Sequence, residues 1–315
     1  MVTDSARQHM RGRTVLITGG TDGIGFHTAR TLAGIGAHVL VTGRDADRGR
    51  AAAAAIDAET GRRSVTFVPA DHSTVGGNHD AARQVRAHVS SLDVLVNNVG
   101  GLFEQRWETA DGYEATLAMN FVGPYALTAQ LLPLLRAAAP ARCVNVISAG
   151  FKICRQNPFE DLQSTDGYVA ADAYARAKLL NLLCSLALAD AVAADQITVN
   201  AVQPGLAWTR MTQAMTPQTM PVFRRIWPLI RLVQRHRSPD KAGRRVALLA
   251  SSPAVSAYTG RYFQGGTRPK RLSARELDVG AQRRALRLAA ELVAEARTGT
   301  GVQTNDEEPR SWTPR

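Results

Sequence analysis

The sequence predicts an α/β protein built on one doubly wound parallel sheet with helices on both faces. Three observations support this prediction. Short runs of β-branched residues alternate with longer Ala- and Leu-rich stretches, which is typical of βαβ units. Several runs are apolar throughout, as expected of strands covered on both faces. The first run leads directly into a glycine-rich turn, Thr18 to Gly25, from which a helix starts.

The strands are predicted from their β-branched and apolar residues: 14–17, 38–41, 64–68, 94–96, 142–147, 197–202 and 261–263. Helices are predicted from the Ala- and Leu-rich stretches: 24–36, 46–58, 78–90, 111–138, 172–194, 239–251 and 273–297. No linker divides the chain, so we expect one domain over residues 13–297. The N-terminal tail at 1–12 and the tail at 298–315 are predicted from composition, the latter as disordered.

Composition excludes several classes of protein. With 315 residues, 45% of them hydrophobic, the chain can bury a sizeable core and is not disordered as a whole. The three cysteines are widely spaced, so neither a disulfide framework nor a thiolate zinc site is expected, and no metal site is predicted. The first residues lack the apolar stretch of a signal peptide, and no window approaches the ~18 apolar residues of a membrane span. We expect a cytoplasmic protein.

The formal net charge of +11 is unevenly distributed. Residues 1–205 hold 18 Lys and Arg against 19 Asp and Glu, whereas residues 206–315 hold 20 against 8. The basic excess therefore belongs to the last third of the chain. Because the first two thirds are nearly neutral, we expect no nucleic-acid partner.

The glycine-rich turn predicts a dinucleotide site. Glycines let the backbone approach a pyrophosphate, whose charge is met by N–H groups at the start of the following helix. An ordinary strand-to-helix turn also uses glycine, but this turn follows the first strand of a βαβ series. The residues expected to contact the cofactor here are Gly19, Thr21, Asp22, Gly23, Ile24 and Gly25.

Arg44 follows the second predicted strand, at the place where an acidic residue would favour NAD. A guanidinium there can form charge-assisted hydrogen bonds to a 2′-phosphate, so NADP(H) is the preferred cofactor, with NAD(H) as the alternative. Arg48, one helical turn later, is a second cation for this phosphate. The competing interpretation of Arg44 is a solvated surface arginine.

Polar residues also follow the third and fourth predicted strands, at the carboxyl edge where open α/β sheets bind ligands. Asp71 is a candidate acceptor for an adenine amino group, or a helix cap. The sequence Asn97-Asn-Val-Gly100 brings Asn98 and Gly100 to the same edge.

Tyr174 and Lys178 are the most informative pair in the chain. Residues four apart share one face of a helix, so the phenol and the ammonium lie close together. A Tyr titrates near pH ~10, and a neighbouring cation lowers that pKa towards the range of general acid–base catalysis. Such pairs are also common on helix surfaces. Ser148, at the end of the fifth strand, reaches the same edge, where its hydroxyl can hold a carbonyl oxygen beside the phenol. Asn120 is a polar residue in an apolar helix, either a part of this site or only a packed, satisfied amide.

These motifs together resemble the classical short-chain dehydrogenase/reductase family. The pattern comprises the TGxxxGIG turn, an NNAG element at 97–100 in which Val99 replaces Ala, and a PG turn followed by Thr. It also includes a catalytic tetrad in family order. The likeness covers about residues 12–265 and implies a Rossmann-type fold with a C-terminal substrate lid. The tetrad residues are Asn120, Ser148, Tyr174 and Lys178, and the turn residues are Pro204, Gly205 and Thr209.

The resemblance also implies roles for these residues. Tyr174 would be the general acid/base, and Ser148 would orient the substrate oxygen. Lys178 would lower the Tyr pKa and bind the nicotinamide ribose, Asn120 would hold a relay water, and Thr209 would bind the carboxamide. The hydride itself comes from the cofactor.

A gap of 26 residues between Ser148 and Tyr174 is longer than in most of the family. This insert and the sequence after Asn120 resemble the retinol dehydrogenase-like and protochlorophyllide reductase-like branch. That likeness implies a lipophilic ketone, aldehyde or alcohol as substrate. It also implies a homodimer or homotetramer formed through the helices at 111–138 and 172–194.

Residues 206–240 are predicted to form the lid, and they are both apolar and cationic. Three interpretations stay open: an amphipathic lid with an apolar inner face and solvated arginines, a segment that contacts a membrane surface, or a docking site for an acidic carrier protein or an anionic substrate. We expect an NADP(H)-dependent carbonyl reductase or dehydrogenase. The alternative is a non-catalytic dinucleotide sensor or a basic-surface interaction protein on the same fold, against which the intact tetrad argues.

Overall fold

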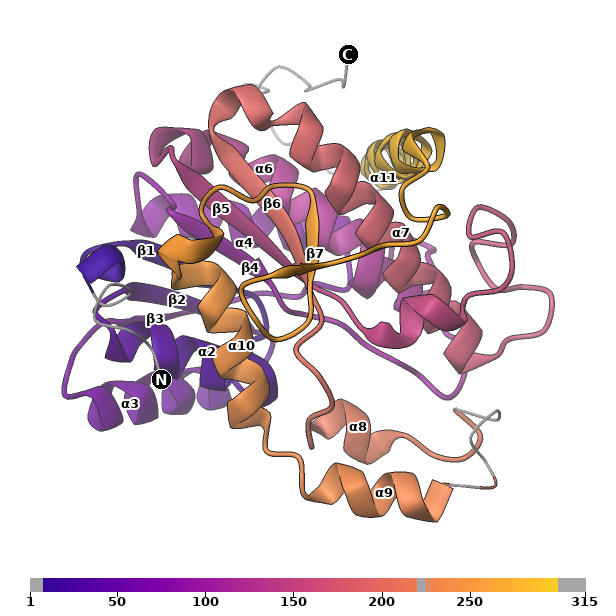
Figure 1. Ribbon diagram of the computed structural model, residues 1–315, viewed down its shortest axis with the longest axis horizontal. Coiled ribbons are helices and arrows are strands. Elements are labelled where there is room, and N and C mark those ends of the chain that lie inside the picture. The colour runs from indigo at the N-terminus through magenta and orange to yellow at the C-terminus, as the bar shows by residue number, and fades with distance from the viewer. Residues whose placement is uncertain (1–7, 220–224, 226, 300–315) are drawn as a thin grey trace.

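Parallel pairing of the apolar strands builds the centre of the molecule (Figure 1). The computed structural model describes residues 8–219, 225 and 227–299. Within these ranges eight strands form one sheet in the order β3-β2-β1-β4-β5-β6-β7-β8, parallel except for the last pair. The predicted doubly wound sheet is confirmed. Its strands are β1 Thr14–Ile17, β2 His38–Gly43, β3 Val65–Pro69, β4 Val94–Asn97, β5 Ala141–Val146, β6 Ile197–Val202, β7 Arg261–Phe263 and β8 Pro269–Lys270.

Helices cover both faces of the sheet (Figure 1). Those packed in the apolar cluster on one face are α2 Gly23–Gly34, α3 Ala46–Thr60 and α10 Pro239–Ser251. Those in the cluster on the other face are α4 Val75–His88, α5 Ala115–Leu117, α6 Gly123–Ala137, α7 Ala170–Ala191 and α11 Val279–Gly299. Between α5 and α6 the chain forms a π-helical segment, Ala118–Val122. The short helices α8 Arg210–Ala214 and α9 Trp227–Arg235 lie apart from the sheet, at the bottom of the view.

Several predicted boundaries move because side chains cap the backbone. The helix predicted from residue 111 begins at Ala115, because the buried Glu114 carboxylate accepts the N–H groups of Thr116 and Leu117 at 2.7 and 2.8 Å. The helix predicted from residue 273 begins at Val279, where Asp278 accepts the N–H of Gly280. The two-residue strand β8 was not predicted, because it is too short to show a pattern.

The predicted tails are only partly described. Residues 8–10 form a helical turn whose Met10 is buried against the sheet, so this end of the proposed N-terminal tail is packed. The predicted C-terminal tail begins two residues too early, because α11 continues through residues 298 and 299. Residues 1–7 and 300–315 lie outside the described residues. Part of the predicted lid, 220–224 and 226, lies outside them as well.

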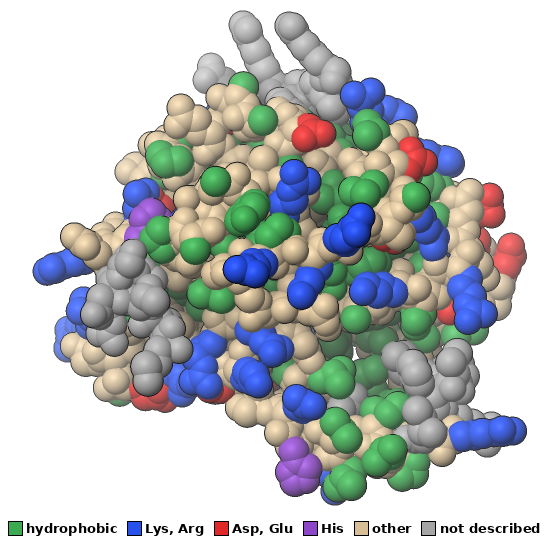
Figure 2. Space-filling model, viewed as in Figure 1, with side chains coloured by type: hydrophobic (Ala, Val, Ile, Leu, Met, Phe, Trp, Pro, Cys, Tyr) green, Lys and Arg blue, Asp and Glu red, His purple; other side chains and the backbone are tan. Residues whose placement is uncertain are grey.

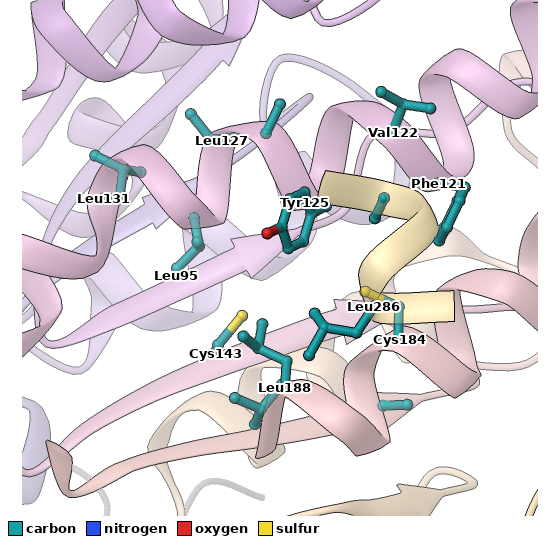
Figure 3. Close-up of a cluster of buried hydrophobic side chains, with 14 of the residues drawn as sticks. Leu95, Phe121, Val122, Tyr125, Leu127, Leu131, Cys143, Cys184, Leu188 and Leu286 are labelled. Atoms are coloured by element: carbon teal, nitrogen blue, oxygen red, sulfur yellow. The ribbon is translucent and has the colours of Figure 1, made fainter. Parts of the chain in front are cut away.

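The outer helix α11 packs on α7 and α6 (Figure 3). Leu286 of α11 lies among side chains that include Tyr125 of α6, Cys184 of α7 and Phe121 of the π-helical segment. The Tyr113 hydroxyl also donates to the carbonyl of Leu292 at 2.6 Å. α7 is therefore buried along almost its whole length, which explains why most of its surface is apolar.

Candidate active site

Tyr174 and Lys178 lie on the buried helix α7, beside the carboxyl end of β5. The Lys178 Nζ is 5.7 Å from the centre of the Tyr174 ring and donates to the carbonyl of Val146 at 3.0 Å. Both side chains are buried. The helical spacing thus brings the phenol and the ammonium together as predicted.

Ser148 follows β5 by two residues and faces Tyr174. Its Oγ accepts the N–H of Gly150 at 3.1 Å, which starts a short 3₁₀ turn, and a hydrogen bond links it to Tyr174. A Cβ on Gly150 would lie 3.3 Å from the Tyr174 ring, so the turn packs closely on the phenol. The serine and the tyrosine are therefore adjacent.

The two titratable groups of the tetrad are perturbed in opposite directions. Burial raises the pKa of Tyr174, and the hydrogen bond with Ser148 acts against this rise. Burial lowers the pKa of Lys178 to about 8. Each shift favours the neutral form, as desolvation does in general. A charge brought next to the phenol therefore has a large effect on its titration.

Asn120 lies in the π-helical segment, a feature often found at functional sites. Its Nδ2 donates to the carbonyls of Gly101 and Thr116, each at 2.7 Å. Its buried Oδ1 has no hydrogen-bond partner among the described residues. The amide is thus only half satisfied, and a buried acceptor without a partner costs about 1–3 kcal/mol unless a water binds it.

Gly100 lies where Asn120 and Lys178 meet. A Cβ there would lie 2.6 Å from Asn120 Oδ1 and 3.2 Å from Lys178 Nζ. The missing side chain leaves room beside both polar atoms. All four predicted tetrad residues are therefore brought to one edge of the sheet.

The glycine turn folds tightly over the ends of β1 and β4. A Cβ on Gly25 would lie 2.2 Å from the carbonyl oxygen of Gly19 and 2.7 Å from the side-chain nitrogen of Asn98. Asn98, predicted as a cofactor contact, donates through Nδ2 to the carbonyl of Thr18 at 2.8 Å. Its amide thus holds the turn in place. Asp22 accepts the N–H of Gly23 at 2.7 Å and caps α2.

Arg44 is exposed at the end of β2 and has no ion pair or hydrogen bond within the described part of the chain. The preceding Gly43 packs on the glycine turn, since a Cβ there would lie 2.8 Å from Thr21. Arg48 instead pairs with Asp45 at 3.1 Å. Asp71 accepts the N–H and the hydroxyl of Ser73, while the cap of α4 is Thr74.

The Pro204–Gly205 turn brings the start of the lid onto the glycine turn. Thr209 caps α8, and a Cβ on Gly23 would lie 3.2 Å from its methyl group. Arg210 Nε pairs with Asp22 at 2.7 Å. A cleft of about 500 Å³ is lined by both segments.

A second arginine, not predicted from the sequence, supports this turn. Arg245 of α10 donates to the carbonyl of Pro204 at 2.8 Å. Gly205 has a φ of 98° and leaves space for the guanidinium, since a Cβ there would lie 2.5 Å from it. The sequence did not predict this role, because Arg245 is one of many arginines in the last third of the chain.

Sequence reasoning also missed a polar stripe on α7. Asn181 and Ser185 continue the spacing of Tyr174 and Lys178 at intervals of four, three and four residues, which is one helix face. Both are buried, and Asn181 Nδ2 donates to the carbonyl of Asn120 at 2.6 Å. Polar residues at this spacing in an apolar helix are the signal that could have revealed them.

The site fits a dinucleotide on its own geometry. The first turn of α2 directs N–H groups to the edge of the sheet, the glycines keep side chains away from it, and an unpaired guanidinium lies beside it. Among the described residues no group of three His, Cys, Asp or Glu side chains gathers at a metal-like site, and no described helix is long and apolar enough to cross a membrane.

Comparisons with known proteins agree with this geometry. The family described as short chain dehydrogenase matches residues 13–219. Polyprenol dehydrogenase of Mus musculus is 32% identical over 96% of this chain and 88% of its own length, and retinol dehydrogenase 14 of Homo sapiens is 33% identical over 87% and 84%. Among solved structures, a protein from Mycobacterium paratuberculosis superposes with a TM-score of 0.69 at 26% identity, covering 91% of this chain and 97% of its own. The Pseudomonas aeruginosa RhlG/NADP active-site complex gives 0.64 at 28%, covering 84% and 99%.

Proposed function

This chain belongs to the short-chain dehydrogenase family, in its retinol dehydrogenase-like branch, and on that premise we propose that it transfers hydride between NADP(H) and a lipophilic ketone, aldehyde or alcohol. It is an NAD(P)-dependent oxidoreductase that acts on CH–OH or C=O groups. The observation that carries the proposed chemistry is the buried Tyr174 phenol between the Ser148 hydroxyl and the Lys178 ammonium.

In this proposal each tetrad residue has one task. Tyr174 donates its proton to the oxygen of a carbonyl as it is reduced, and takes the proton back from an alcohol in the reverse direction. The Ser148 hydroxyl holds that oxygen beside the phenol. Lys178 stabilises the phenolate electrostatically. Asn120 Oδ1, buried and unpartnered, supports a water that would pass protons to Lys178.

The bound nicotinamide cofactor would supply or accept the hydride, and this chain's own residues would hold it. The glycine turn and the first turn of α2 are proposed to bind the pyrophosphate, through Gly19, Thr21, Asp22, Gly23, Ile24 and Gly25. Asp71, Gly100, Pro204, Gly205 and Thr209 border the same edge and are proposed as further contacts, with Tyr174 and Lys178 at the ribose. Asn98 acts through the turn that it holds.

Arg44 supports NADP(H) over NAD(H), because its exposed guanidinium is unpaired and follows β2. We expect Arg44→Asp to move the ratio of kcat/KM for NADPH over NADH towards NADH by roughly tenfold or more, the value of one charged hydrogen bond. Arg50→Asp is the matched control, because Arg50 on α3 pairs with Asp47 and faces solvent. An unchanged ratio in the Arg44 variant would mean that this residue is only a surface arginine.

A panel of lipophilic ketones, aldehydes and alcohols, followed by NADPH absorbance, tests the substrate class. Turnover of the lipophilic compounds, with little or no turnover of their polar analogues, supports a lipophilic substrate. If NADPH binds but none of the lipophilic compounds reacts, the proposed substrate class is wrong.

The lid has an apolar outer face, which favours one of its three interpretations. Leu229, Leu232 and Val233 form a stripe on α9 and are 60%, 56% and 39% exposed, whereas Trp227 is buried. Arg231 is not a solvated arginine, since it stacks 4.7 Å from the Trp208 ring and donates to two carbonyls of α8. Exposed cations accompany the stripe, and Figure 2 shows green side chains and blue ones together at the lower edge, where α9 lies.

We therefore propose peripheral contact with an anionic membrane surface through residues 206–240, in place of an acidic carrier protein, for an otherwise cytoplasmic protein. No acidic residue occurs between Asp195 and Asp240, and an exposed apolar stripe with arginines suits a lipid interface. The protein should float with anionic vesicles at low salt, and the double variant Leu229→Glu/Leu232→Glu should float less. Leu277→Glu, at an exposed leucine elsewhere, is the control. Absence of flotation with anionic vesicles at low salt would exclude the membrane contact.

The subunit contact implied by the resemblance needs the outer faces of α6 and α7. In this chain α11 packs on both helices and occupies part of their outer faces, which argues against that contact. We propose that a homodimer or homotetramer would use another surface. Light scattering on the full chain measures its mass directly.

A further inference from the structure

The π-helical segment that carries Asn120 depends on donors from outside the helix ladder. Such a segment interrupts the regular i→i−4 bonding, so carbonyl groups within it and in the turn before it need other partners. Two buried amides provide them. Asn120 Nδ2 donates to the carbonyl of Thr116 at 2.7 Å, and Asn181 Nδ2 donates to the carbonyl of Asn120 at 2.6 Å. Asn181 therefore holds the backbone of the π-helical segment at Asn120.

Asn181 also connects this segment to Lys178. It follows Lys178 by three residues on α7, so the two side chains share a helix face. Asn120 Oδ1 and Lys178 Nζ both lie against the space left open at Gly100. A movement of the Asn120 backbone would therefore change the polar surroundings of the Lys178 ammonium.

The oxygen of the Asn181 amide is connected to the sheet through Ser185. Ser185 Oγ donates to the carbonyl of Asn181 at 2.6 Å and lies 3.2 Å from its Oδ1, and Asn145 Nδ2 donates to Ser185 Oγ at 2.8 Å. Asn97 Nδ2 donates to Asn145 Oδ1 at 2.8 Å. These buried side chains join β4 and β5 to α7, and a buried chain of this kind locks the rotamer of each member.

We propose that Asn181 is a positioning residue for the proposed oxidoreductase: it holds the π-helical segment so that Asn120 and Lys178 stay in register behind Tyr174. This inference rests on the proposed function for its effect on turnover. Asn181 touches neither Tyr174 nor the reacting atoms and acts through Asn120.

Asn181→Leu tests the proposal, because leucine keeps a similar volume and removes the donor. When Asn120 moves, Lys178 loses a polar neighbour, its ammonium is less stable, and the Tyr174 phenolate loses support. We expect kcat to fall roughly tenfold, as for a small misplacement of catalytic groups, with a smaller change in the Kd for NADPH. In alcohol oxidation, which needs the phenolate, the rising limb of the pH profile should move to higher pH. Asn200→Leu is the matched control, because it removes a buried amide of β6 that donates to the carbonyl of Tyr258 at 2.6 Å, outside this chain of side chains. It should lower the Tm with kcat and the pH profile unchanged.

A second readout needs no substrate. The chain has four lysines, so selective ¹³Cε labelling gives four NMR signals, of which Lys178→Met identifies one. In Asn181→Leu the Lys178 signal should titrate at lower pH than in the wild type, and Asn181→Ala gives the same comparison if the leucine variant does not fold. An unchanged titration overturns the positioning role whatever the turnover. A shifted titration in a protein that reduces no carbonyl would support the positioning and contradict the proposed function.

Discussion

Tyr174→Phe is expected to lower kcat by roughly 10²-fold or more, because it removes the only proton that the proposed mechanism gives to the substrate oxygen. Phenylalanine keeps the ring, so the packing on Gly150 and the position near Lys178 should persist. The Kd for NADPH and the Tm should therefore stay close to those of the wild type. Steady-state kinetics with the best substrate of the panel, a cofactor titration and a thermal melt measure the three quantities.

The pH dependence gives an independent check on the same residue. Reduction needs the protonated phenol and oxidation needs the phenolate, so oxidation by the wild type should increase with pH and reduction should decrease. Burial raises the pKa of Tyr174, which places this change on the alkaline side unless the Lys178 cation and the bound cofactor lower it. Substantial turnover in Tyr174→Phe, with the wild-type pH profile, would show that another group moves the proton.

Gly25→Ala is expected to weaken NADPH binding by more than about tenfold, which corresponds to about 1.4 kcal/mol. The new Cβ would lie 2.2 Å from the backbone carbonyl of Gly19, and backbone cannot rotate away as a side chain can. The turn must therefore open, and the link from Asn98 to the turn at 2.8 Å opens with it. Isothermal titration with NADPH measures the affinity, and a melt shows whether the fold persists.

Gly76→Ala is the matched control for that substitution. It also replaces a helical glycine near a helix start, but a Cβ there meets nothing within 4 Å. Alanine should stabilise α4 slightly by its helix propensity and leave the Kd unchanged. Equal NADPH affinity in the Gly25 and Gly76 variants would mean that the glycine turn does not approach the cofactor.

Most of the fold could be predicted because periodic patterns are local. Strands such as β1 and β6 and the helix α10 were predicted with their observed bounds, since apolar runs and helical repeats are visible in single segments. The predictions that failed depended on caps and distant packing. The start of α5 is set by a buried glutamate, and one apolar face of α7 is covered by α11, which follows it by more than 80 residues.

The candidate site likewise contains residues that a local pattern predicts and residues whose role depends on distant contacts. Tyr174, Lys178 and Ser148 were predicted because spacing and position at a strand end are sequence properties. Asn98 was correctly placed at the edge, but its amide holds the glycine turn, a role that only the bond to Thr18 reveals. The support given by Arg245 and Asn181 comes from contacts across 41 and 61 residues, and no local pattern encodes these.

The sequence by itself determined the doubly wound sheet, the order of the motifs along its carboxyl edge and the residue types of the proposed tetrad, because each is written in local periodicity and residue type. It also located the +11 charge in the last third of the chain. Tertiary structure alone decided that α11 covers α6 and α7, that the apolar stripe of α9 faces outward, and that Asn120 lies in a π-helical segment held from α7. These features depend on which distant surfaces exclude water together, and such pairings are a property of the packed molecule.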